Sequence, residues 1–220
     1  MTSVEPSSGI VNLPRLRLPA PRHGQRDISL YEALERRRTT RQISSAPVSL
    51  QTLSDLLWAA WGVNRTDGPF GATGRTAASA SNSQEIDVYV AMRDAVYRYD
   101  PLDLQLVPAA SGDLRGYAMT PGQREANVDV PVQLIYIADI HRLTHTAGFK
   151  EPGLQDVETQ KSYYYVDAGM IAANVYLFCA GEGLAAWFHN CDRTALALRL
   201  GLREDQRVLF AQSVGYPENV

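Results

Sequence analysis

The chain has 220 residues, a formal net charge of −3 at pH 7, 45% hydrophobic residues and 20% charged residues. This length is enough for one sizeable domain with a core. The acidic balance argues against nucleic acid as a main partner, because nucleic-acid-binding faces are broadly basic. No apolar run approaches the ~20 residues that span a bilayer, and no secretory signal is apparent. Cys179 and Cys191 form no CxxC motif, so we expect no disulfide and a cytoplasmic protein with no membrane partner.

The N-terminal part of the chain predicts an arm followed by a single domain. Residues 1–27 are rich in Pro, Ser and Arg and predict an extended arm, for which a partner subunit would offer a surface. Residues 28–220 form the expected domain. Ser29 and Glu32 make a capping box that predicts the start of the first helix. We expect the last turn of this helix to hold the three arginines of residues 36–38.

The remaining elements predict a mixed α+β domain. The first of them are a helix over 50–61, a strand over 86–92, a hairpin over 95–107, a helix over 113–128 and a buried strand over 132–138. The later ones are a loop or lid over 141–162, a core helix over 167–180, a strand over 184–188, a helix over 194–200 and a strand over 207–215. Helices and strands are interleaved, with a hairpin between them, which is typical of α+β folds.

Three motifs of other functional classes are weak in this sequence. His141 and His145 have the i, i+4 spacing of metal ligands, but no HExxH motif or third ligand accompanies them, so we expect no metal site. Cys191 lies near His189, yet no GxSxG motif or other hydrolase feature is present, and a buried spectator cysteine is expected. The glycine-rich residues 68–74 lack the GK[ST] ending of a Walker loop.

The stretch ERRRTTRQ, residues 35–42, is locally basic in an acidic chain, with four arginines within six positions. Charge at a helix end accounts for Arg36. In an extended segment, Arg37, Thr39 and Arg41 would point the same way. Guanidinium groups and a hydroxyl suit a phosphate. On the residues alone, a solvated patch and a phosphate site both remain open.

Four stretches, in order along the chain, resemble motifs of the FMN-dependent nitroreductase family. They are ERRRTTRQ at 35–42, GRTAASASNSQEIDVYV at 74–90, DAGMIAANVYLFCAGEGLAAWF at 167–188 and VGYP at 214–217. The resemblance implies a nitroreductase-like α+β fold whose central, mainly antiparallel sheet is flanked by helices. It also implies an intertwined homodimer with two FMN sites at the subunit interface.

The resemblance further implies which residues bind the cofactor. Arg37 and Thr39 would hold the FMN phosphate, with Arg38 beside it or near the ribityl chain. Arg41 would lie near N1 and O2 of the ring, where a cation favours the reduced flavin. The other chain would supply the segment of Ala78, Ser79, Ala80 and Asn82. A backbone N–H toward flavin N5 would come from the turn of Phe188, His189 and Asn190.

The sequence also departs from the family motifs. Glu85 and Ala78 stand where the family has Pro. The C-terminal Lys-x-Arg of many nitroreductases is missing, so the chain resembles the short dehydrogenase-like branch that includes the thiazole/oxazole-forming peptide dehydrogenases. Arg75 is then expected as a supplementary cation for the phosphate.

The implied activity is a ping-pong hydride transfer. NADH or NADPH would reduce FMN, and a nitroaromatic, a quinone or a similar small acceptor would then be reduced. No residue is expected as an obligatory acid or base, because the chemistry resides in the cofactor. Residues 141–162, with Tyr163–Tyr165 beside them, would form the substrate-side wall. Two alternatives are an FMN-dependent dehydrogenase of a biosynthetic substrate and a flavin-binding protein without turnover.

Overall fold

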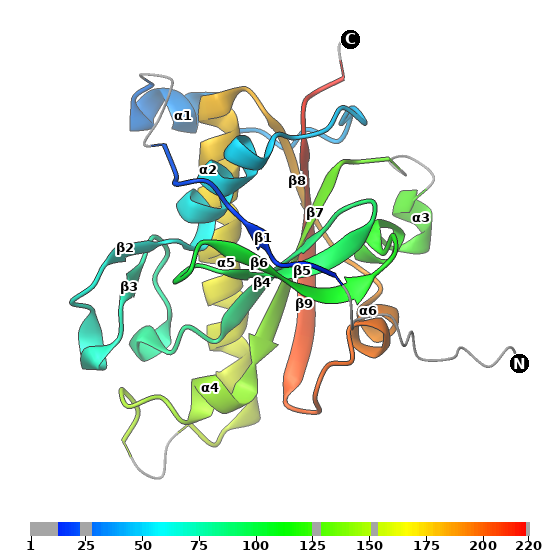
Figure 1. Cartoon of the computed structure of the whole chain (residues 1–220). Helices are drawn as coiled ribbons and strands as arrows, with labels where there is room; N and C mark the ends of the chain where they lie inside the picture. The colour runs from blue at the N-terminus through cyan, green and yellow to red at the C-terminus, as the bar shows by residue number, and fades with distance from the viewer. Residues whose placement is uncertain (1–12, 23–27, 125–128, 151–153, 219–220) are drawn as a thin grey trace, which may run out of the picture.

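A seven-stranded antiparallel sheet forms the centre of the protein (Figure 1). The computed structural model describes residues 13–22, 28–124, 129–150 and 154–218. The strand order is β1-β6-β5-β4-β7-β9-β8, and each neighbouring pair is antiparallel. The strands are β1 Leu16–Arg17, β4 Ile86–Ala91, β5 Ala95–Asp100, β6 Gln105–Ser111, β7 Val132–Asp139, β8 Ala185–His189 and β9 Gln206–Gly215. The expected α+β fold with an antiparallel sheet is confirmed.

Helices cover both faces of this sheet. The α-helices are α1 Leu30–Arg36, α2 Leu50–Trp61, α3 Pro121–Arg124, α4 Ile140–Thr144, α5 Val157–Glu182 and α6 Arg193–Arg199. Among the described residues, short 3-10 helices lie in the connections: η2 Pro69–Gly71, η3 Ala80–Asn82 and η4 Arg115–Ala118. A separate two-stranded sheet pairs β2 Val63–Arg65 with β3 Gly74–Arg75. Among the described residues, no helix is both long and apolar enough to cross a membrane.

The central strand β7 divides the core into two layers. All of its residues are buried, as the apolar run of its sequence predicts. Leu134 and Tyr136 pack in the layer that contains α2 and α5, while Ile135 and Ile137 pack in the layer that contains η4 and α6. This alternation follows from the two-residue period of a strand. Full burial of one such aliphatic side chain contributes roughly 1.5–3 kcal/mol.

Side-chain caps fix the starts of the helices around the site. The Ser29 and Ser49 side chains accept N–H groups of α1 and α2, as the sequence predicts. Helix α1 ends at Arg36, and Arg37 is already extended, so the expectation that its last turn holds residues 36–38 is wrong. This early ending leaves the following arginines on an extended segment.

The prediction of a loop or lid over residues 141–162 is wrong for much of this range. Residues 140–144 form α4, and α5 begins at Val157, ten residues before the expected start of the core helix. Asp156 caps α5, because its carboxylate accepts the Thr159 N–H at 2.7 Å. The polar first turns of α5 face away from the core, which hides their helical period in the sequence. Residues 151–153 lie outside the described residues.

The single helix expected over 113–128 is also wrong. The chain forms η4 and then α3, with an extended Met119 between them. Pro121 explains the break, because a proline disfavours helical backbone at the residue before it and suits the first turn of a new helix. Residues 125–128 lie outside the described residues.

The described part of the predicted arm lies against its own chain. Leu16 and Arg17 pair with β6, and Leu18 is buried. The Arg22 guanidinium lies 3.2 Å from the Asp55 carboxylate of α2. Residues 1–12 and 23–27 lie outside the described residues, so the division into an arm and one domain stays a prediction.

Candidate functional site

The basic segment Arg37–Gln42 runs beside β8, the end strand of the sheet. The Thr40 N–H donates to the Ala186 carbonyl at 3.0 Å, and Ile43 forms a bridge with Pro217. The bond from Thr40 fills a hydrogen-bonding position that the end strand β8 would otherwise leave open, and the bridge to Pro217 holds the segment beside the residues that follow β9. The sheet edge therefore holds the predicted cofactor residues in an extended conformation.

Alternate residues of this segment contact aromatic side chains. The Arg37 guanidinium carbon lies 5.7 Å from the centre of the Tyr176 ring, and the Thr39 hydroxyl lies 3.1 Å from the Tyr176 hydroxyl. The Arg41 guanidinium lies 5.6 Å from the centre of the Trp187 ring. Both distances are within the range of cation–π attraction. The expected alternation is thus present, and it places these residues over α5 and β8.

A cavity of about 490 Å³ opens between this segment, the end of α5 and the start of β8. Of the predicted residues, Arg38 and Thr39 line it, whereas Arg37 and Arg41 do not. The lining residues are Arg36, Arg38, Thr39, Thr40, Gln42, Tyr176, Cys179, Ala180, Gly183, Leu184, Ala185, Pro217 and Glu218. The sequence interpretation missed Arg36, Thr40 and Gln42. The same two-residue period would have placed Thr40 and Gln42 beside Arg38, whereas Arg36 is the last residue of α1.

Apart from the Glu218 carboxylate, the charged side chains around this cavity are arginines, which suit an anion. Arg37, Arg38 and Arg41 are exposed, and no carboxylate of the described residues forms an ion pair with them. Arg36 is paired with Glu32 within α1. Guanidinium groups beside threonine hydroxyls are a donor set that recognises phosphate.

Tyr176 connects the basic segment to β8, and the sequence interpretation missed it. Its hydroxyl accepts the Phe188 N–H at 2.8 Å and also contacts Thr39. The sequence feature that could have indicated this role is that Tyr176 is a single phenol side chain in the apolar stretch over residues 167–180. Because Phe188 is engaged by this bond, its N–H does not point freely toward a ligand.

The side chains that follow Phe188 are held within the protein. His189 is buried, with Nδ1 2.9 Å from the Asn190 carbonyl and Nε2 2.8 Å from the Ser213 hydroxyl. Burial lowers the pKa of His189. Cys191 is also buried, and burial raises its pKa to about 11, so the thiol is not poised as a nucleophile. Both cysteines, Cys179 included, are free, as expected.

The predicted partner segment forms a tight turn against α5. The Ala80 N–H donates to the Asp167 carboxylate at 2.8 Å, and the Gln84 N–H donates to the Ser79 hydroxyl at 3.1 Å. The Asn82 side chain donates to two carbonyls of residues 69–73. Ala78 is exposed at the start of the turn. Apart from Ala78, the predicted residues of this turn are thus already engaged in hydrogen bonds of their own chain.

Within one chain, the turn and the basic segment lie at different levels of α5. The turn contacts Asp167, whereas the basic segment contacts Tyr176, nine residues later. At 1.5 Å per residue, this separation is about 13 Å along the helix axis. The structure brings Arg37–Arg41 together with Phe188, and it leaves Ala78–Asn82 apart from them.

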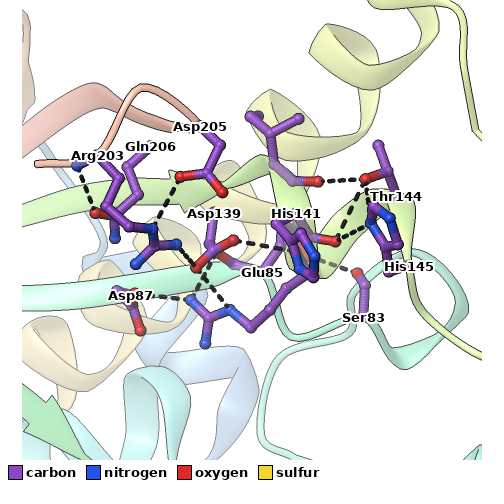
Figure 2. Close-up of polar contacts among 12 residues, drawn as sticks. Ser83, Glu85, Asp87, Asp139, His141, Thr144, His145, Arg203, Asp205 and Gln206 are labelled. Carbon is purple, nitrogen blue, oxygen red and sulfur yellow. Dashed lines mark hydrogen bonds and ion pairs between the residues drawn. The ribbon is translucent and has the colours of Figure 1, made fainter.

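Other polar groups interact on α4 and between the elements around it. His141 and His145 stack on α4, with ring centres 4.0 Å apart, and His145 Nδ1 contacts the His141 carbonyl (Figure 2). Asp139 pairs with Arg203 at 2.8 Å and with Arg142 at 3.6 Å. In the part of the chain that the structure describes, no group of three or more His, Cys, Asp or Glu side chains is arranged to hold a metal.

Comparison with known proteins identifies the family. Residues 34–216 match the nitroreductase family. The chain belongs to this family. The match spans the basic segment, the turn at 79–84, α5 and β8, so it includes all lining residues of the cavity except Pro217 and Glu218.

Two relatives support this membership. A candidate nitroreductase from Ralstonia eutropha JMP134 is 32% identical, with a TM-score of 0.80, over 94% of this chain and 90% of that chain. A candidate nitroreductase from Methanocaldococcus jannaschii is 28% identical over 79% of this chain and 86% of its own length.

A more distant structure shares the nitroreductase fold. The NADPH:FMN oxidoreductase from Vibrio harveyi, solved with NAD+, is 18% identical, with a TM-score of 0.59, over 86% of this chain and 69% of that chain. At this identity, the likeness concerns the fold alone.

Proposed function

We propose that this nitroreductase-family protein binds FMN and uses NADH or NADPH to reduce nitroaromatics, quinones or similar small acceptors. The observation that carries the proposal is the set of unpaired arginines and threonine hydroxyls beside the 490 Å³ cavity at the β8 edge. A flavin phosphate has the charge and the acceptor oxygens that this donor set requires. When bound, FMN supplies the two-electron chemistry.

In this proposal, some residues of the basic segment bind the phosphate of FMN and another contacts its ring. Arg38, Thr39 and Thr40, which line the cavity, would hold the phosphate, and Arg37 would add charge beside it. Arg41, which lies over Trp187, would face the ring and favour its electron-rich form. Tyr176 would fix this arrangement, because its hydroxyl contacts both Thr39 and the β8 backbone.

Asn190 is the best donor toward the reacting edge of the ring. Successive N–H groups of a strand point to opposite edges. The Phe188 N–H points away from β9 to Tyr176, and Asn190 directly follows β8. If the alternation of the strand continues by one residue, the Asn190 N–H would be directed to the same open edge. Asn190 is exposed, whereas His189 is buried. Of the three predicted residues, we therefore assign Asn190 to this role.

We also propose that the cofactor site is shared between two copies of this chain. Helix α5 exposes the apolar side chains of Tyr163, Val166 and Met170, and α1 exposes those of Leu30 and Tyr31. Exposed apolar faces of this kind mark interaction surfaces. A second chain covering α5 would bring its turn over 78–82 toward the basic segment, which one chain alone does not do.

Aromatic side chains near the end of β8 are proposed as the substrate-side wall. Phe188 and Phe210 have ring centres 4.9 Å apart, and Phe210 and Tyr165 have ring centres 5.7 Å apart. Phe149 and Tyr163 form a second pair at 5.9 Å. Flat, partly exposed rings suit the aromatic acceptors of the proposed reaction.

FMN titration and nicotinamide oxidation test this function directly. We expect the protein to take up FMN and to oxidise NADH or NADPH faster when a nitroaromatic or quinone is present. The name of the Vibrio harveyi enzyme and its bound NAD+ support the choice of nicotinamide. FMN uptake without nicotinamide oxidation would favour the biosynthetic dehydrogenase or the binding role. Failure to bind FMN would contradict the proposal.

A further inference from the structure

Two carboxyl groups are buried together beneath the turn over residues 79–84. Glu85, the residue immediately before β4, is fully buried, and Asp167 of α5 is 3% exposed. The two side chains hold neighbouring residues of one turn, since Asp167 binds Ala80, Glu85 binds Ser83, and the Ser83 N–H donates to the Ala80 carbonyl at 2.9 Å. The charge of Asp167 acts on Glu85 and raises its pKa. A pair of buried carboxyls is costly when both are ionised, because like charges repel strongly in a low-dielectric interior.

The hydrogen bonds around this pair leave one donor missing. The Ser83 hydroxyl donates to Glu85 Oε2 at 2.6 Å (Figure 2), and the Ala80 N–H donates to Asp167 Oδ2 at 2.8 Å. Glu85 Oε1 is buried and receives no hydrogen bond from any donor of the described residues. A carboxylate cannot donate, so a proton held between Glu85 and Asp167 supplies the missing donor.

The charged groups of the neighbouring elements do not neutralise the pair. Arg142 of α4 donates to the Glu85 backbone carbonyl at 3.1 Å, while its charge is paired with Asp87 of β4 and Asp139 of β7. Arg75 of β3 donates to the Gln84 side chain. Burial, followed by the charge of Asp167, raises the pKa of Glu85 to about 7, and burial also raises the pKa of Asp167.

The turn above the pair depends on such support. Ser81, Asn82 and Gln84 have positive φ angles of 49°, 53° and 51°. Backbone of this kind costs roughly 1–3 kcal/mol for each residue other than glycine and persists only where its surroundings hold it. Asp167 holds the turn through Ala80, and Glu85 holds it through Ser83.

We infer that Glu85 and Asp167 are positioning residues that share one proton and thereby hold the turn over 79–84 in its strained form. Loss of this proton places two negative charges side by side, so the pair separates and releases Ala80. The effect on the cofactor rests on the proposed function: because the turn would contribute to the FMN site, FMN binding weakens when the proton is lost.

The protection of the Ala80 amide against hydrogen exchange tests this inference without the cofactor. In wild type, we expect the protection factor to fall about tenfold from about pH 6 to about pH 8, which is the change in the protonated fraction of a group titrating near pH 7. The Kd for FMN should rise over the same range. If the protein binds no FMN at any pH, the proposed function fails, while the exchange measurement still decides the role of the pair.

Conservative variants separate proton sharing from mere packing. In Glu85→Gln the amide donates permanently to Asp167, and in Asp167→Asn it donates to Glu85, so either variant should keep the protection and lose its pH dependence. Glu158→Gln, which alters an exposed acid of the same helix, should keep the wild-type profile. A wild-type protection factor that does not change with pH would overturn the inference. So would a fall in Glu85→Gln equal to that of wild type.

Discussion

The basic segment Arg37–Gln42 and the turn over 79–84 are both predicted to contact the cofactor, yet they differ in almost every physical respect. Arg37, Arg38 and Arg41 are exposed and without carboxylate partners among the described residues. The turn is half-buried, strained and closed by internal hydrogen bonds. One region offers unused donors, and the other offers a fixed shape.

This difference indicates two kinds of contribution to a single site. Charged donors bind an anion strongly even when they are mobile, since guanidinium pairs supply most of their energy through charge. A rigid turn contributes its shape, because its strained backbone is already formed before a ligand binds. Changes in the basic segment should therefore affect affinity, whereas changes under the turn should affect stability and its dependence on pH.

The largest expected effect concerns the turn. Because the pKa of Glu85 is raised from 4.5 to about 7, the folded chain binds more protons than the unfolded chain between these pH values. The free energy of unfolding should therefore fall by about 3 kcal/mol as the pH rises through this window, and the loss is complete above it. Glu85→Gln should lack this component. Urea titrations at several pH values measure it, and equal slopes for both proteins would contradict the account.

A slightly smaller effect is expected in the basic segment. Arg38→Ala removes a charged donor from the cavity and should weaken FMN binding by about 1.5–3 kcal/mol, with little change in stability. Arg17→Ala is the matched control, because Arg17 is exposed on β1 at the opposite end of the sheet. Equal FMN affinities of Arg38→Ala and wild type would favour the solvated-patch interpretation.

Tyr176→Phe should affect both properties moderately. The ring beneath Arg37 remains, but the Phe188 N–H loses its acceptor, and Thr39 loses its partner. We expect a loss of about 1 kcal/mol in the free energy of unfolding and a weaker FMN complex. Thermal unfolding beside Tyr31→Phe, whose ring is 81% exposed, measures the first effect. If the two variants unfold alike, Tyr176 does not connect the segment to β8.

The smallest effect is expected at the surface of α5. Lys161 and Glu158 form an exposed ion pair at 2.6 Å. Its removal in Lys161→Met should leave the free energy of unfolding almost unchanged, because exposed pairs are screened by solvent. A larger loss in urea titrations would mean that the polar first turns of α5 contribute more than their exposure suggests.

The sequence predicted the features that depend on local patterns. The structure has the helix cap at Ser29, which follows from residue type and spacing. It also has the buried run of β7 and the alternation of the basic segment, which follow from the residue pattern of extended chains. The early start of α5 was not predictable in this way, because the capping residue Asp156 precedes turns whose side chains face solvent.

Features that depend on tertiary contacts could also not be predicted from the sequence. Tyr176 looked like one more core residue until its contacts with Thr39 and Phe188 were visible. In the sequence, Glu85 was notable only because it stands where the family motif has proline. Its interaction with Asp167, 82 positions away, could not be predicted from either motif, because it depends on the tertiary structure.

Mixed dimers test the central claim, that each cofactor site combines the basic segment of one chain with the turn of another. One chain would carry Arg38→Ala and its partner Asn82→Gly, since glycine tolerates the positive φ at that position. If the site is shared, one site of each mixed dimer carries both lesions and the other is intact, so half of the sites should bind FMN with wild-type affinity. Two equally weakened sites would contradict the account.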